Sequence, residues 1–152
     1  MIQTRTRLEA RDLKKLAPGL YPAVNALDAA ASETGVEPEL IELINLRVSQ
    51  INGCAYCVHY HTHHGRGMGI PDAKLTLVVT WEEAGIFSER EEAALAWAEA
   101  LTLIAATHVP DAAYEAAQAV FSEQELAGLT TAVIAINAWN RISVSYRYAP
   151  DI

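Results

Sequence analysis

Two cysteines and a histidine stand close together in the chain, as Cys54, Cys57 and His61. In a helix, residues three or four positions apart lie on the same face, so Cys54 would neighbour Cys57, and Cys57 would neighbour His61. Two thiols close enough to bridge, with an imidazole within reach of one of them, form the core of a dithiol redox centre. The spacing therefore predicts a helix from about Gly53 to Gly65 that presents a redox-active cysteine pair.

The residues in front of this pair favour a helix that begins close to it. Asn52 is a good helix cap, and Gly53 lets the chain turn tightly. Cys54 is then expected in the first helical turn, where unpaired backbone N–H groups and the helix dipole stabilise a thiolate. This position favours the charged form of Cys54.

The whole chain has the apolar spacing of helices, and no stretch alternates with the two-residue period of a strand. Capping boxes at Ser88–Glu91 and Ser122–Glu125 mark two helix starts. With 152 residues, the chain is long enough to bury the core of one domain. The sequence therefore predicts a single all-α domain over residues 1–152, with an N-terminal arm, residues 1–21, lying on its body. The expected helices cover about 9–16, 22–32, 38–51, 53–65, 72–84, 93–106, 111–120 and 122–144.

The helix expected over residues 38–51 is apolar around most of its circumference, which is typical of a central helix. Its polar exceptions are Glu42, Asn45 and Ser49, whose spacing places them in one narrow seam. Only two residues separate this helix from the cysteine helix, so we expect an antiparallel hairpin in which the two pack side by side.

In that hairpin Glu42 and His61 come roughly level. At ~1.5 Å per residue, Glu42 lies ~14–15 Å before the turn and His61 ~12 Å after it. We therefore expect a proton relay in which Glu42 orients and polarises His61, while His61 takes the proton from Cys57, because the thiolate is the nucleophile. The alternatives at this point are a solvated Glu42 at the helix edge and a surface His61.

The other aromatic and imidazole side chains near the motif have simpler expected roles. Tyr56 is expected to pack, although its hydroxyl is a candidate supporting hydrogen-bond partner in the relay. His59, His63 and His64 are expected on the solvent side. Packing is also the expected role of the tryptophans, Trp81, Trp97 and Trp139.

Asn137 and Asn140 stand in an otherwise apolar helix, beside Trp139. This group is expected near the site or at a subunit contact. Amide side chains in such a place need hydrogen-bond partners if they are buried.

Charge and composition exclude several classes of function. The chain has 19 acidic and 11 basic residues, and its net charge of −8 argues against a nucleic-acid partner. The first seven residues lack the apolar core of a secretory signal, and the longest uncharged run, residues 126–140, is too short and too polar to span a membrane. We therefore expect a cytoplasmic protein, in a compartment where paired cysteines are more often redox-active or metal-binding than permanently bridged. No glycine-rich phosphate loop and no haem or flavin motif is present, so no cofactor is expected.

The motif resembles the signature of the alkyl hydroperoxidase D-like (AhpD-like) branch of the carboxymuconolactone decarboxylase superfamily. That signature is a glutamate, eleven intervening residues, a CxxC with His or Tyr before its second cysteine, and a histidine four residues on. Each of these positions is matched here, by Glu42, Cys54, Tyr56, Cys57 and His61. Further similarity lies in residues 49–54 and 136–141.

The resemblance implies an all-helical fold whose hairpin presents the cysteines, assembly into homo-oligomers (trimers or hexamers), and thiol-dependent reduction of hydroperoxides. It implies that Cys57 attacks the peroxide and becomes a sulfenic acid, which Cys54 resolves as a disulfide. An external dithiol, of thioredoxin-like or lipoyl type, would then reduce the bridge. The place of Cys54 at the helix start suits a thiol that faces this donor, while His61 serves Cys57.

Three other functions remain open at this point. Cys54, Cys57, His61 and His64 are possible zinc ligands, although one short helix cannot easily wrap a tetrahedral ion. A carbon-centred reaction like that of the decarboxylase relatives would not need the cysteine pair. A redox-sensing or assembly protein would use the same fold with little turnover.

Overall fold

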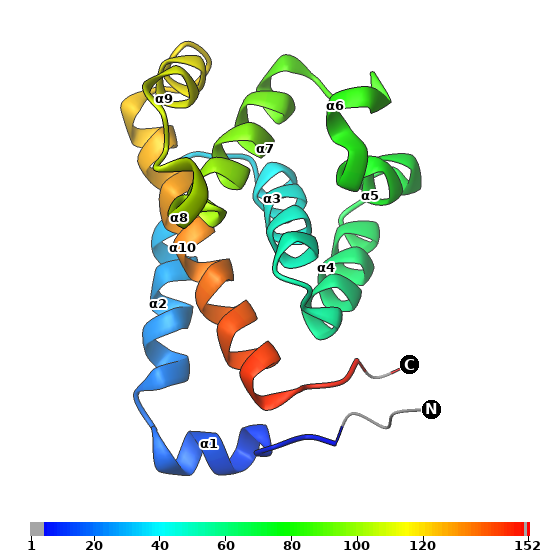
Figure 1. Cartoon of the computed structure of the whole chain (residues 1–152), viewed down its shortest axis with the longest axis vertical. Helices are drawn as coiled ribbons and strands as arrows, with labels where there is room; N and C mark the ends of the chain where they lie inside the picture. Colours follow the sequence, from blue (N-terminus) through cyan, green and yellow to red (C-terminus); the bar gives the residue numbers. More distant parts are fainter. Residues whose placement is uncertain (1–4, 151) are drawn as a thin grey trace.

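The computed structural model describes residues 5–150 and 152, and every regular element in that part of the chain is helical (Figure 1). The all-α expectation is confirmed. Residues 1–4, the start of the expected N-terminal arm, lie outside the described residues. The elements are α1 (Ala10–Leu16), α2 (Leu20–Ser32), α3 (Pro38–Ile51), α4 (Ala55–Gly67), α5 (Asp72–Leu77), the 3₁₀ turn η1 (Val78–Thr80), α6 (Trp81–Ala84), α7 (Glu89–Thr102), α8 (Ile104–Thr107), α9 (Asp111–Gln118) and α10 (Glu123–Tyr146).

The central element is α3, which packs against α4, α7 and α10. Its buried apolar side chains serve two hydrophobic cores. Leu40, Ile44 and Val48 join the larger core, which contains residues of α7 and α10. Leu43 and Leu46 join a second core with residues of α5 and α6. The nearly complete apolar circumference is therefore explained, because α3 is covered on more than one side.

The longest helix, α10, runs alongside α2 (Figure 1). The two approach closely where the chain leaves α2. A Cβ atom added to Gly128 would lie 2.6 Å from the Cβ of Thr34, a separation that real Cβ atoms do not adopt. Glycine at position 128 thus lets α10 approach the end of α2, and this packing forms one side of the cavity described below.

The helix expected over residues 72–84 is wrong as a single element, because the chain divides it into α5, η1 and α6. Leu75, Val78 and Trp81 are all buried in the second core. Their spacing of three residues matches the three residues per turn of a 3₁₀ helix, so the tighter turn keeps all three side chains in the core.

The capping boxes at Ser88–Glu91 and Ser122–Glu125 are both present, and they start α7 and α10. The expectation of a helix running to Ala106 is wrong, since α7 ends at Thr102 and α8 follows after one residue. There the hydroxyl of Thr107 donates a hydrogen bond of 2.7 Å to the carbonyl oxygen of Ala100, which satisfies a backbone acceptor left free at the break.

One arginine connects the starts of three helices. The guanidinium of Arg90 donates hydrogen bonds to both carboxylate oxygens of Glu37, at 2.7 and 3.0 Å, and to the carboxylate of Glu125. The bond from Arg90 lowers the pKa of the Glu37 carboxyl. The backbone of Ser122, and then Arg90, lower the pKa of Glu125. These charge-assisted bonds fix the N-terminal ends of α3, α7 and α10 relative to one another.

The N-terminal segment is joined to the end of α10. The amide of Arg7 donates to the carbonyl oxygen of Tyr146 at 3.0 Å, and its guanidinium donates to that of Ser145 at 3.2 Å. Leu13 of α1, Val24 of α2 and Ile142 of α10 form a small third core. The expected arm therefore lies on the body, as far as it is described.

We predict that Gly128→Ala lowers the free energy of unfolding by about 1–3 kcal/mol, because the new methyl group forces α10 away from Thr34. Chemical denaturation followed by circular dichroism measures the change. Gly67→Ala is the matched control: an added Cβ there meets no atom within 4 Å, so no loss is expected. Equal stabilities for the two variants would contradict the close contact.

Candidate active site

The turn between α3 and α4 contains Asn52 and Gly53, and Gly53 has a backbone φ of +66°, which favours glycine. The expectation that Asn52 caps the cysteine helix is wrong. Cys54 is the N-cap residue of α4, one position before the first helical turn. The sulfur of Cys54 accepts a hydrogen bond of 3.3 Å from the backbone N–H of Cys57. An N–H group aimed at this sulfur stabilises negative charge on it, as the helix dipole does.

Cys54 and Cys57 form a disulfide, with their Cα atoms 5.3 Å apart. Both residues are buried, at 2% and 4% exposure. Cys57 lines the cavity beside α4, and Cys54 is not among the residues that line it. In this oxidised form the expectation of an accessible Cys54 is therefore wrong, and Cys57 is the cysteine that a molecule in the cavity meets.

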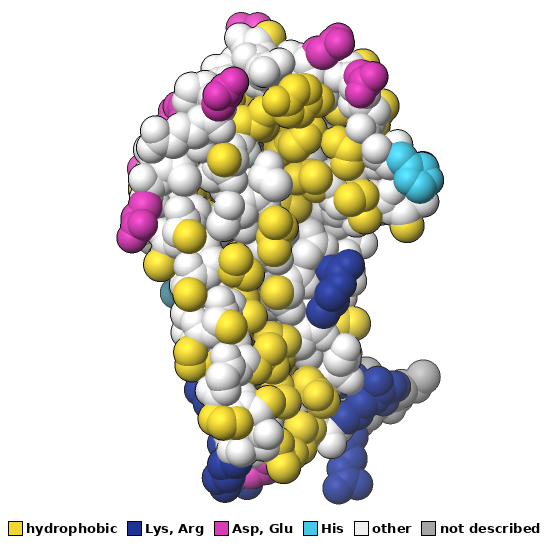
Figure 2. Space-filling model, turned by 90° about the vertical axis from the view of Figure 1, so that its left-hand side faces the viewer, with side chains coloured by type: hydrophobic (Ala, Val, Ile, Leu, Met, Phe, Trp, Pro, Cys, Tyr) yellow, Lys and Arg dark blue, Asp and Glu magenta, His cyan; other side chains and the backbone are white. Residues whose placement is uncertain are grey.

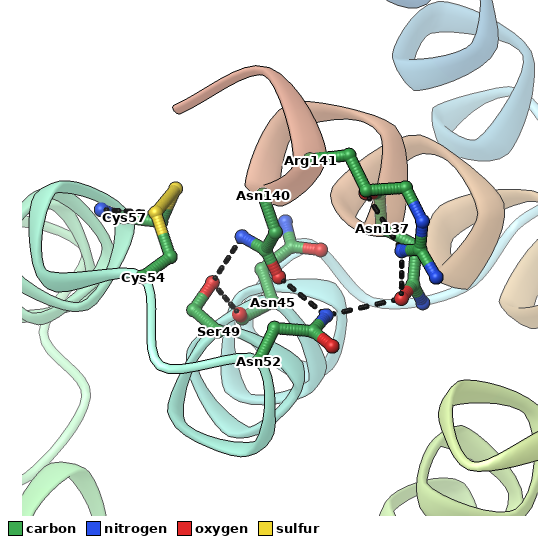
Figure 3. Close-up of a disulfide and its surroundings, with 8 residues drawn as sticks. All are labelled: Asn45, Ser49, Asn52, Cys54, Cys57, Asn137, Asn140 and Arg141. Carbon is green, nitrogen blue, oxygen red and sulfur yellow. Dashed lines mark hydrogen bonds between the residues drawn. A yellow bond between two sulfur atoms is a disulfide. The ribbon is translucent and has the colours of Figure 1, made fainter. Parts of the chain in front are cut away.

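A network of amide side chains connects the turn to α10 (Figure 3). The side-chain amide of Asn52 donates to the side-chain oxygens of Asn137, at 3.0 Å, and Asn140, at 2.9 Å. Asn140 donates in turn to the hydroxyl of Ser49 at 3.0 Å, which donates to the carbonyl oxygen of Asn45 at 2.7 Å. The network gives the buried Asn140 the partners that it needs, and it ties Asn52, the C-cap residue of α3, to α10.

Glu42 and His61 meet across the hairpin. The Nδ1 atom of His61 lies 2.8 Å from the Oε1 atom of Glu42, and the Glu42 side chain is only 6% exposed. The two helices approach closely here because α4 has a glycine at position 65. A Cβ on Gly65 would lie 3.4 Å from Cγ of Glu42 and 2.9 Å from Cδ2 of Leu75. The solvated Glu42 considered above is therefore wrong, and so is the surface His61, whose side chain is 12% exposed.

The structure also corrects the expectation for one of the other histidines. His59 and His63 are exposed, as expected. His64 is half-exposed, but its Nδ1 atom lies 3.2 Å from Oε1 of Glu42, the same oxygen that His61 contacts. The signal for this contact was available in the sequence, since His64 follows His61 by three residues and so shares its face of the helix.

A cavity of about 880 Å³ lies between α2, α3, α4 and α10. Its wall includes Cys57, His61 and Glu42, so the disulfide and the carboxylate–imidazole pair face the same space. Another part of the wall contains Asp28 and Trp139, whose indole N–H donates to the Asp28 carboxylate at 2.7 Å. The volume is in the range of small-molecule binding sites.

The tyrosines that line this cavity are Tyr21, Tyr56, Tyr60 and Tyr148. The ring of Tyr56 packs edge-on against that of Tyr148, with ring centroids 6.4 Å apart, in keeping with the packing role expected of Tyr56. Burial, and then a hydrogen bond with Tyr21, raise the pKa of the Tyr148 phenol. Tyr148 therefore stays neutral throughout the physiological pH range.

Among the described residues, no group of three or more His, Cys, Asp or Glu side chains is arranged to hold a metal ion. The same part of the chain contains no helix with the length and apolar character needed to cross a membrane.

Residues 18–100 match the model of the carboxymuconolactone decarboxylase family. An uncharacterized Bacillus subtilis protein, YdfG, is 33% identical over 131 residues, which cover 86% of this chain and 89% of the relative. A crystal structure of an Agrobacterium tumefaciens protein of unknown function, provisionally assigned as the antioxidant defence protein AhpD, is 39% identical, with a TM-score of 0.90 over 97% of this chain and 99% of that one. An uncharacterized peroxidase-related protein from Silicibacter sp. TM1040 shares the fold, with a TM-score of 0.75 at 16% identity over 98% of this chain and 93% of that one.

We predict that Asn140→Ala lowers the free energy of unfolding by about 1–3 kcal/mol, because it removes one hydrogen-bond partner each from Asn52 and Ser49. Chemical denaturation of the oxidised protein gives the value. Asn25→Ala, at an exposed position of α2, is the control and should change stability by less than about 0.5 kcal/mol. An unchanged free energy of unfolding in Asn140→Ala would show that the network does not hold the turn.

Proposed function

Since the chain belongs to the AhpD-like branch of the carboxymuconolactone decarboxylase family, we propose that it is a thiol-dependent peroxidase. The proposal assigns catalysis to Cys57, Cys54, His61 and Glu42. The observation that supports it most is the buried Glu42 carboxylate, hydrogen-bonded to His61 in the wall of the cavity that Cys57 also lines.

The oxidative half of the cycle begins with the reduced protein. His61 takes the proton of the Cys57 thiol, and the thiolate attacks the terminal oxygen of a hydroperoxide. The O–O bond breaks as the S–O bond forms, and the leaving alkoxide takes the proton from His61 to become an alcohol. Cys57 is then a sulfenic acid, and Glu42 has stabilised the imidazolium that formed on the way.

Cys54 resolves this intermediate. Its sulfur attacks the sulfur of Cys57, and hydroxide leaves and combines with the proton of the Cys54 thiol to form water. The sum is two thiols and one hydroperoxide converted into a disulfide, an alcohol and water. The N-cap position of Cys54 supports this step, because the amide of Cys57 is directed at its sulfur and favours the thiolate.

The reductive half requires an external dithiol, since the chain has no third cysteine. A thioredoxin-like or lipoyl-type donor would attack one sulfur of the bridge, form a mixed disulfide, and release the protein in its reduced form as its own second thiol closes the donor disulfide. Cys57 is the sulfur that the cavity makes available. Such a cycle fits the reducing cytoplasm expected from the sequence.

A redox-sensing protein is the second candidate, and the burial of both cysteines favours it, because buried sulfurs exchange slowly with external thiols. The two candidates differ in turnover. A peroxidase consumes many equivalents of hydroperoxide in the presence of a dithiol, whereas a sensor consumes about one and stops.

We predict that the reduced wild-type protein consumes cumene hydroperoxide continuously when dithiothreitol is present, and that Cys57→Ser and Cys54→Ser abolish this turnover. Glu42→Gln and His61→Ala should slow it at least about tenfold, because the relay loses its carboxylate or its base. Loss of hydroperoxide, followed by a colorimetric assay, measures the rates.

His59→Ala and Glu39→Gln are the matched controls, since both residues are exposed and lie on the same two helices. They should retain the wild-type rate. Unchanged rates in Glu42→Gln and His61→Ala would remove the relay from the mechanism, and a single equivalent consumed by the wild type would favour the sensor.

We also propose that the chain forms a homo-oligomer, a trimer or a hexamer. On the face drawn in Figure 2, hydrophobic side chains form a band between a mostly acidic end and a mostly basic end. Exposed large hydrophobic side chains also occur on α8, α9 and α10. Contiguous apolar surface is typical of contacts between proteins. The exposed hydrophobic residues of these three helices are Ile104, Tyr114, Ile134 and Val144, which are 44–54% exposed.

Light scattering on a gel-filtration column is expected to give three or six times the chain mass of 16.5 kDa. Ile134→Glu should shift the protein toward the monomer, because it places a charge within apolar surface. Leu16→Glu is the control, since Leu16 of α1 is 74% exposed and lies outside the set above. A wild-type mass of one chain would refute the assembly.

A further inference from the structure

We propose that His64 is a positioning residue that sets how tightly His61 holds its proton, by sharing the carboxylate of Glu42. The inference deepens the proposed peroxidase function and rests on it for its catalytic meaning. The coupling between the two imidazoles rests on geometry alone.

Both imidazoles converge on one oxygen atom. The Nδ1 atom of His61 lies 2.8 Å from Oε1 of Glu42, and the Nδ1 atom of His64 lies 3.2 Å from the same atom. Glu42 has one negative charge and its side chain is 6% exposed, so water screens it little. One carboxylate compensates one imidazolium fully but cannot compensate two. The protonation of either ring therefore opposes the protonation of the other.

The two rings differ in their access to solvent. The His61 side chain is 12% exposed, whereas that of His64 is 52% exposed and exchanges protons with bulk water. The ring of Tyr60 holds His64 in place, because the two rings are stacked with centroids 5.8 Å apart and an interplanar angle of 18°. Tyr60 also packs edge-on against His61, with centroids 5.0 Å apart. His64 is thus a fixed, solvent-facing ring whose charge acts on His61 through the buried carboxylate.

The sign of the effect follows from this arrangement. When His64 is protonated, it neutralises Glu42, and His61 gives up its proton more readily to an alkoxide leaving group. When His64 is neutral, Glu42 acts on His61 alone and favours the imidazolium, which is the form that pairs with the Cys57 thiolate. His64 therefore adjusts the balance between the base and acid roles that His61 fills in one cycle.

Other ionisable groups around the pair are accounted for. On α4 the next charged residue, Arg66, is paired with Asp72 at 2.7 Å, and on α5 Lys74 is paired with Glu91. Among the tyrosines of the cavity wall, burial raises the pKa of Tyr148. The charged groups that α1, α2 and the segment before them contribute to the cavity wall are Glu9, Lys14 and Asp28.

Two of these three groups contact side chains other than Glu42, His61 and His64. Asp28 accepts the Trp139 indole, and the ammonium of Lys14 lies 4.9 Å from the ring centroid of Tyr21. The cavity-lining residues of α10 and the segment after it include Ser143 and Tyr148 but no charged side chain. His61 and His64 are the two imidazoles in contact with the Glu42 carboxylate, so removing His64 changes the charge next to it.

The test is a titration of the His61 imidazole by NMR in the oxidised protein, in which no thiol titrates. We expect the midpoint of the His61 titration to rise by about half to one pH unit in His64→Gln, because His61 then no longer shares the Glu42 carboxylate. His64→Lys, which keeps a positive charge there, should lower the midpoint or leave it at the wild-type value. His63→Gln, one position away and exposed, is the control and should not move it.

A midpoint that is unchanged or lower in His64→Gln would overturn the inference, as would an equal rise in His63→Gln. A rise in His64→Gln that is absent from His64→Lys distinguishes charge coupling from a change of structure, which would raise the midpoint in both variants. An equal rise in both variants would overturn the inference. The falling limb of the pH profile for single-turnover oxidation by cumene hydroperoxide should move up with the midpoint in His64→Gln. A midpoint that shifts in a protein without peroxidase turnover would uphold the coupling and refute the proposed function instead.

Discussion

The hydrogen bond between the buried carboxylate of Glu42 and the imidazole of His61 is the interaction on which the rest of the site depends. A carboxylate on a helix that is otherwise apolar is expensive to bury unless it is paired and hydrogen-bonded. The pairing requires α3 and α4 to pack closely, and Gly65 permits this because any side chain there would meet Glu42 and Leu75. The hairpin is thus held in one register by a polar contact, while the hydrophobic cores on either side of α3 supply its stability.

The cysteines are positioned by a different set of contacts. The turn before Cys54 is fixed to α10 by Asn52 and Asn140, and Cys54 caps α4 in place of the usual oxygen-bearing side chain. The cysteine whose sulfur accepts a backbone N–H and the cysteine that shares a cavity wall with the carboxylate–imidazole pair are therefore different residues. This division supports the assignment of resolving and attacking roles, because one thiolate is favoured by the helix terminus and the other by a neighbouring base.

Much of this arrangement follows from sequence spacing. The eleven residues between Glu42 and Cys54 place the carboxylate level with His61 once the chain reverses, and helical rise alone gives that result. Where the structure differs from these expectations, the cause is a contact that the spacing of residues in the sequence does not reveal. Asn52 has a side chain suited to capping, but it is the C-cap residue of the preceding helix, and its amide donates to asparagines of a helix that is remote in sequence.

Tertiary contacts also explain the other expectations that the structure corrects. The break of the helix expected over 72–84 comes from burial at three-residue intervals, which depends on where the second core lies. His64, expected on the solvent side together with His59 and His63, contacts Glu42 instead. Its contact with Glu42 was foreseeable from its spacing to His61, but only after that residue had been placed against the carboxylate.

The central claim is that Cys57 is the sulfur that reacts with peroxide. It is tested most directly by treating reduced Cys54→Ser protein with one equivalent of cumene hydroperoxide in the presence of dimedone, which traps sulfenic acids, and locating the adduct by peptide mass spectrometry. We predict a stoichiometric adduct on Cys57 in this protein, and none on Cys54 in the reciprocal Cys57→Ser protein. An adduct on Cys54 with none on Cys57 would contradict it.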